Sequence, residues 1–222
     1  MFPVYLNEKG HDGESFDDFN REFEAICKLH HEKNRALAFA IILYDFENPE
    51  IAKVLRDQDY WNALNQISGK FLTVFSFHMD AKHAPLIHPI LQHNTAENDT
   101  FDATKRFVKE RFGFDGRMPS ILFFQISNKS VTDSYLVTLR AKTVEDAFYE
   151  IKNSISASVD AISQVQPEFR GNKAEIFSLI ATRLKEREAV FKITRTVKMT
   201  GSILEVIGKL AGIAKLADSL FH

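Results

Sequence analysis

The sequence has one cysteine, Cys27, among its 222 residues. A single cysteine cannot form a disulfide within the chain, so a disulfide scaffold is excluded and a reducing, intracellular environment is the simpler expectation. Long apolar runs are also missing, because the runs at 36–44 and 121–126 are far shorter than the ~20 residues that a membrane-spanning helix needs. Residues 1–34 are polar and lack the apolar core of a secretory signal. We therefore expect a cytoplasmic protein that does not cross a membrane.

The chain also lacks an excess of charge of either sign. It has 28 Lys and Arg against 30 Asp and Glu, which gives a formal net charge of −2. Such a balance provides no global attraction to nucleic acid or to acidic lipid. The sequence has no glycine-rich phosphate loop, no zinc-finger spacing of Cys or His, and no catalytic serine signature. We therefore expect no nucleic-acid partner and no cofactor, and we assign no catalytic residue.

Helical and strand patterns alternate along the chain. Apolar residues recur every three or four positions in the predicted helices and form short runs in the predicted strands. The expected elements, in order, are a helix at 15–29, a strand at 36–44, a helix at 49–69 interrupted near 57–59, a strand at 71–77, a helix from about 100 to 113, strands at 121–126 and 135–139, and a helix from 143 to about 162. The short link between the last two strands predicts an antiparallel hairpin. This order predicts an α/β fold with a mixed four-stranded sheet flanked by helices, with an N-terminal helix before it and a C-terminal helical extension after it.

One segment makes the fold prediction more specific. A helix ending near Phe112 leads through Gly113 to Met118 and Pro119, and then into the strand at 121–126. This arrangement resembles the thioredoxin-like superfamily, in which a proline before a strand is cis and faces the active site. The resemblance implies that Pro119 is that proline.

The resemblance also organises the chain into three parts. It covers rather more than half of the chain and assigns residues 35–166 to a thioredoxin-like domain. Residues 1–34 then form an N-terminal helical segment. A junction at 167–171 leads into a helical extension that occupies residues 167–222.

The chain departs from this family where the first predicted strand meets the first long helix. The family has its Cys-x-x-Cys motif there, because a helix N-terminus lowers the pKa of the attacking thiol. Residues 45–50 contain no Cys, Ser or Thr that could act as a nucleophile. We therefore predict a redox-inactive member that is not a dithiol oxidoreductase. The corresponding groove is predicted to contain Asp45, Glu47, Asn48, Pro49, Met118 and Pro119.

Histidines and Cys27 offer two other candidate sites. His78, His83, His88 and His93 recur every fifth residue, and imidazoles are common ligands of zinc and copper. Neither a helix nor a strand places residues at this spacing on one face, so we interpret them as solvated loop histidines, and a metal site there is the alternative. Cys27 lies in the apolar register of the helix at 15–29, which favours a small buried side chain over a reactive thiol.

The end of the chain has the cleanest amphipathic pattern. After Ser202, a possible N-cap, apolar residues follow one stripe of a predicted helix, and from Arg183 onward eight basic residues stand against four acidic ones. The residues of this predicted interaction helix are Ile203, Val206, Ile207, Leu210, Ile213 and Phe221. We expect the stripe to pack against protein, which could be its own domain, another subunit or a partner helix. A membrane surface is the less favoured alternative, because the polar face is short and only mildly basic.

These features favour binding over catalysis. The leading hypothesis is a redox-inactive thioredoxin-like protein that acts in binding or assembly and associates through its C-terminal amphipathic helices. The alternative is an enzyme or metal-binding protein that uses either the groove near Glu47 and Pro119 or the loop from His78 to His93. A redox role that depends on Cys27 is a third possibility.

Overall fold

The computed structural model describes residues 1–5, 16–33, 36–45, 48–78, 97–114, 118–127 and 130–200. The chain divides into two compact units, Met1–Leu184 and Lys185–His222. The first unit contains the whole sheet, so it is the unit that positions the candidate site.

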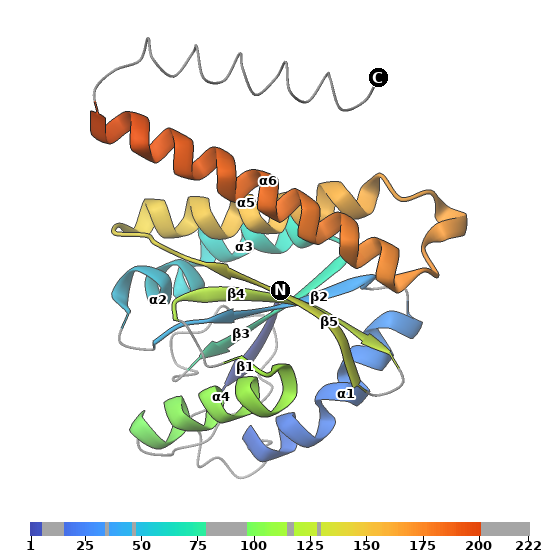
Figure 1. Ribbon diagram of the computed structural model, residues 1–222. Helices are drawn as coiled ribbons and strands as arrows, with labels where there is room; N and C mark the ends of the chain where they lie inside the picture. The colour runs from blue at the N-terminus through green and yellow to red at the C-terminus, as the bar shows by residue number, and fades with distance from the viewer. Residues whose placement is uncertain are drawn as a thin grey trace, which may run out of the picture. The chain divides into compact units, whose positions relative to one another are not determined.

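A five-stranded mixed sheet lies at the centre of the first unit (Figure 1). Its strands are β1 (Phe2–Tyr5), β2 (Ala38–Leu43), β3 (Leu72–His78), β4 (Ser120–Ser127) and β5 (Ser130–Thr138). They are arranged in the order β1-β3-β2-β4-β5. The first three are mutually parallel, whereas β4 is antiparallel to β2 and β5 is antiparallel to β4.

Helices cover both faces of this sheet. Their bounds are α1 (Phe16–Glu32), α2 (Pro49–Arg56), α3 (Gln58–Ser68), α4 (Glu97–Phe112), α5 (Val144–Ser163) and α6 (Lys173–Thr200), with a short 3-10 turn at Pro167–Phe169 between the last two. None of the helices in the described part of the chain is both long enough and apolar enough to span a membrane.

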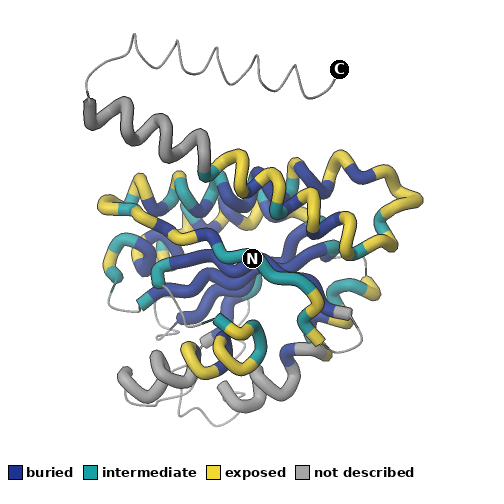
Figure 2. The backbone as a smooth tube through the Cα atoms, in the orientation of Figure 1, coloured by how far each residue is buried: buried dark blue, intermediate teal, exposed yellow. Residues whose placement is uncertain are grey.

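Alternation along β2 explains the two layers of the core. Successive side chains of a strand point to opposite faces, so a fully buried strand contributes to both cores. Ala40 and Ile42 pack in the cluster formed with α2, α3, α5 and the first part of α6. Phe39 and Ile41 pack in the other cluster, which is formed with α1 and α4. The inner strands are accordingly buried along their length (Figure 2).

The α/β class, with a mixed sheet flanked by helices, is confirmed, and so is the antiparallel hairpin of β4 and β5. Within the described residues the sheet has five strands, so the predicted number of four is wrong. The additional strand is β1, which pairs with β3 from Phe2↔Phe75 to Tyr5↔His78. It has only four residues, too few for a recognisable alternating pattern, and it lies in a segment that we interpreted as helical.

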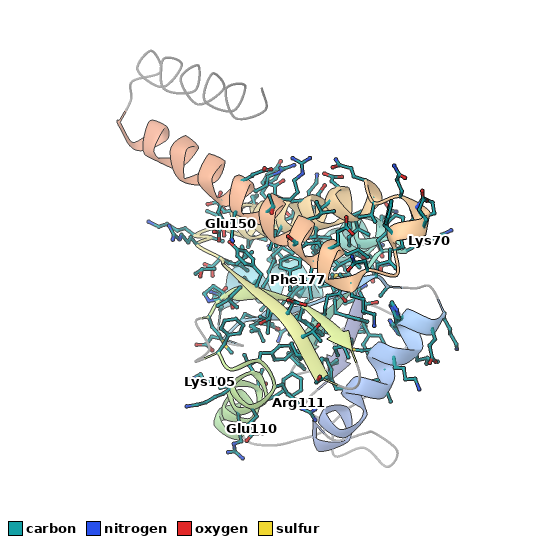
Figure 3. The ribbon with its side chains drawn as sticks, turned by 45° about the vertical axis from the view of Figure 1, so that its right-hand side comes forward. Lys70, Lys105, Glu110, Arg111, Glu150 and Phe177 are labelled. Atoms are coloured by element: carbon teal, nitrogen blue, oxygen red, sulfur yellow. The ribbon has the colours of Figure 1, made fainter. Side chains whose placement is uncertain are left out.

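The first half of α6 belongs to the core of the sheet domain. Ile176, Phe177, Ile180 and Leu184 are buried in the same cluster as α5. Figure 3 shows Phe177 on the part of α6 that lies near the strands. The amino-terminal end of α6 is fixed by Lys173, whose Nζ donates a hydrogen bond to the carbonyl of Ile126 at 2.8 Å. The core of the sheet domain itself therefore covers the apolar residues of this part of the predicted extension.

Candidate functional site

The junction between β2 and α2 is built as a capped helix start. The side chain of Asn48 accepts a hydrogen bond from the backbone N–H of Ile51 at 3.0 Å, and Pro49 occupies the first turn, as the sequence predicts. The backbone N–H of Asn48 donates to the carbonyl of Asp45 at 2.7 Å. Glu47, the other carboxylate assigned to this groove, lies outside the described residues. The Asn48 amide is therefore engaged in capping α2.

Pro119 lies beside this junction. Strands β2 and β4 pair so that Leu43 faces Ser120, which places Pro119 next to the residues that follow β2. The Met118–Pro119 peptide bond is cis, as the resemblance implies for this position. Both residues are half-buried, and the carbonyl of Pro119 accepts a hydrogen bond from the N–H of Leu139 at 2.9 Å. The structure thus brings together the described members of the groove, although they are distant in sequence.

A buried polar cluster that the sequence did not reveal lies beneath α2 and α3. The Tyr44 hydroxyl donates to the carbonyl of Phe77 at 2.9 Å, which joins the carboxyl ends of β2 and β3. Ser76 Oγ and His78 Nε2 are 3.0 Å apart and share a hydrogen bond. The Trp61 ring from α3 meets the His78 ring edge-on, with centroids 5.7 Å apart. The cluster therefore ties the ends of two parallel strands to the helix above them.

Burial keeps both titratable groups of this cluster neutral. Burial, together with the smaller effect of the nearby Arg56 cation, lowers the pKa of His78 to about 3. Burial also raises the pKa of the Tyr44 hydroxyl, while Arg56 acts in the opposite direction. At neutral pH the cluster therefore offers uncharged donors and acceptors, and it does not supply a charged acid or base.

The pKa of His78 predicts a pH-dependent stability. In the unfolded chain a histidine takes up a proton below about pH 6.5, but folded His78 stays neutral down to a pH of about 3. The unfolded state therefore binds more protons in this range, and the free energy of unfolding falls as the pH drops, by up to about 1.4 kcal/mol per pH unit.

Urea denaturation at pH 7 and pH 5 measures this effect. We expect the wild-type chain to lose about 2 kcal/mol more between these two values than the His78→Gln variant, whose side chain does not titrate. Equal losses for the two chains would show that folded His78 titrates as it does in the unfolded state.

The predicted histidine site is only partly covered by the structure. His78 is the last residue of β3 and is fully buried, so our interpretation of it as a solvated loop residue is wrong. The sequence position explains the error, because a histidine at the end of an apolar strand has the same local pattern as one at the start of a loop. His83, His88 and His93 lie outside the described residues. Among the described residues, no group of three or more His, Cys, Asp or Glu is placed to hold a metal ion.

Cys27 lies on α1, on the opposite face of the sheet from α2. Its side chain is 1% exposed and packs in the cluster that contains Phe23 and Phe107. The prediction of a small buried side chain is confirmed. The helix α2, which Asn48 caps, therefore lies across the sheet from Cys27, whereas Met118 packs against the same cluster as Cys27.

The predicted interaction helix, from Ile203 to Phe221, lies outside the described residues.

The described residues form an α/β protein with a mixed sheet, in which the parallel strand β2 ends at a half-exposed junction with α2. The chain matches no protein-family model, no curated protein and no solved structure.

Proposed function

We propose that this chain is a redox-inactive thioredoxin-like protein that acts in binding or assembly. Its sheet domain serves as a scaffold, and the segment 201–222 serves as the association element. The proposal assigns no reaction and no cofactor to the domain.

Topology supports the thioredoxin-like part of the proposal. The strand order β1-β3-β2-β4-β5 combines a parallel β1-β3-β2 half with an antiparallel β4-β5 hairpin, and the crossover helices α1 and α2 lie on opposite faces. The proline that precedes β4 lies beside the junction of β2 and α2. These are the two places that the resemblance links in one groove.

The position of the only cysteine carries the non-redox part of the proposal. Dithiol exchange needs a thiol that is accessible and activated, typically at a helix N-terminus. The N-terminus of α2 has Asn48 as its cap, whereas Cys27 is buried on the other face of the sheet. A thiol in that place lacks the access that exchange requires.

Charge and pattern in the last residues support association through 201–222. The core of the sheet domain includes α6 up to Leu184, and the sequence contains a further apolar stripe from Ile203 to Phe221. An amphipathic stripe of this length is typical of helices that pack against another protein.

Truncation at Thr200 tests the proposed function, because it removes the stripe and keeps all of α6. Light scattering coupled to size-exclusion chromatography should show a higher oligomeric state for the full chain than for the chain 1–200. In the full chain, Val206→Asp with Leu210→Asp should lower the oligomeric state in the same way, whereas Lys209→Gln on the polar face should leave it unchanged. If the full and the shortened chain were both monomeric, this result would contradict an association role for the segment 201–222.

A further inference from the structure

Helix α3 begins and ends at breaks in the helical backbone. Asp57 has an extended conformation, with φ −74° and ψ 126°, and it both ends α2 and caps α3. Gly69 ends α3 with a positive φ of 55°. Residues at the ends of elements are the positions that absorb changes of φ and ψ when an element moves. The backbone therefore allows α3 to move as one unit.

Few residues of α3 are buried. They are Trp61, Leu64 and Ser68, three of its eleven residues, whereas α5 buries eight of its twenty. The half-buried Tyr60 adds a stacking contact with Phe148 of α5, with ring centroids 4.6 Å apart. Elements with little buried surface open at a low cost in free energy. Trp61 is the largest of the buried side chains, so its surroundings strongly affect how firmly α3 is held.

The Trp61 ring covers His78, the last residue of β3. The two rings meet edge-on, and each side chain is only 1% exposed. His78 Nε2 shares a hydrogen bond with Ser76 Oγ at 3.0 Å. A buried imidazolium needs water or an anionic acceptor to compensate its charge, and an indole ring provides neither. His78 can therefore take up a proton at low cost only when α3 has moved away.

The groups that face His78 from other elements bring no negative charge to it. Arg56 of α2 is a cation and disfavours a second positive charge nearby. Tyr44 of β2 donates its hydroxyl to a backbone carbonyl, and burial raises the pKa of that hydroxyl. On β1, Tyr5 pairs with His78 in the register of the two strands, and a phenol is neutral in acid. These groups give an imidazolium no compensation.

We propose that α3 is an acid-sensitive cover, which opens away from the ends of β2 and β3 when His78 is protonated, while the rest of the sheet domain stays folded. With α3 open, the imidazole meets water and takes up a proton below about pH 6.5, as an ordinary histidine does. Beneath the closed helix, burial keeps the pKa of His78 at about 3. The open state therefore binds more protons, and its population rises as the pH falls through this range. This opening involves the sheet domain alone and is independent of the association assigned to 201–222.

Hydrogen exchange followed by mass spectrometry measures this opening in the full chain. Between pH 7 and pH 5, after correction for intrinsic rates, the amides of 58–68 should lose protection by about 25-fold, the ratio that pKa values of about 6.5 and about 3 give. At pH 5 they should exchange faster than the amides of 144–163. Urea below about 1 M should change their exchange little, because a local opening exposes little surface.

Two histidine variants assign the effect. His78→Gln should remove the dependence of α3 exchange on pH, because its side chain does not titrate. His31→Gln, which removes a histidine of α1, is the matched control and should retain the wild-type dependence.

The wild-type chain alone can overturn the opening of α3, so the outcome does not require His78→Gln to fold. If 58–68 and 144–163 exchanged at the same rate at pH 5, with the same dependence on urea, only global unfolding would respond to acid, and a local opening would be rejected. Equal protection of 58–68 at pH 7 and pH 5 would reject it as well. So would an unchanged pH dependence in a folded His78→Gln variant.

Discussion

A chain that ends at Gln166 is expected to lose most of its folding stability, whereas a chain that ends at Thr200 is expected to melt near the temperature of the full chain. The shorter chain lacks Ile176, Ile180 and Leu184, which are at most 1% exposed. Burial of each such side chain contributes roughly 1.5–3 kcal/mol, and a whole domain is stable by only about 5–15 kcal/mol. Removal of α6 therefore takes away a large part of the free energy of unfolding. It also exposes the apolar face of α5.

Single substitutions on α6 separate packing from chain length. Phe177 is 7% exposed, so Phe177→Ala should lower the free energy of unfolding by about 3–5 kcal/mol. Leu179, two residues along the same helix, is 40% exposed. Leu179→Ala should therefore change the free energy of unfolding by no more than about 0.5 kcal/mol. Guanidinium denaturation of the full-length variants measures both values. Similar values at the two positions, or a stable chain 1–166, would show that α6 is not part of the core.

Much of the fold could be predicted from local pattern, because several elements have strong signals of their own. The run that includes β2 is buried on both faces, and Asn48 before Pro49 marks the start of α2. Asp57 caps α3 through hydrogen bonds from the backbone of Asp59 and Tyr60, which explains why the predicted helix is interrupted there. In these cases the local sequence indicates both the type of element and the residue at which it begins or ends.

The errors lie where long-range contacts decide the structure. β1 exists because its four residues pair with β3, about 70 positions later, and nothing in the four residues themselves indicates that partner. The packing of α6 in the same core cluster as α5 could not be predicted from the sequence either, because an amphipathic stripe does not indicate which surface covers it.

The buried cluster at Tyr44 and His78 shows the same limit for the candidate site. Tyr44 was the last residue of a predicted strand and His78 the first of a predicted loop, so neither position indicated a contact with β3 or with Trp61. The neighbouring positions of Asn48 and Pro119 could be inferred only through the resemblance to a known fold. The pairing of Leu43 with Ser120 now provides that proximity directly.

Phe23 provides the strongest test of whether α1 belongs to the sheet domain. Its ring is fully buried, and its centroid lies 5.2 Å from that of Phe107 and 5.6 Å from that of Phe124. It also meets Phe75 at 5.8 Å and Phe112 at 6.2 Å. One side chain of α1 therefore contacts aromatic rings from β3, β4 and α4, in arrangements that add to the effect of burial alone.

The Phe23→Ala variant is accordingly expected to unfold about 3–5 kcal/mol more easily than wild type, in a single transition. A cavity at this point removes contacts from three other elements at once, so the whole domain should be destabilised and not α1 alone. Leu29→Ala is the matched control, because Leu29 lies on the same helix but is 45% exposed, and its effect should stay within about 0.5 kcal/mol. Guanidinium denaturation followed by Trp61 fluorescence and by circular dichroism measures both. If Phe23→Ala left the Trp61 transition unchanged while part of the helical signal melted separately, α1 would be an independent appendage of the sheet domain.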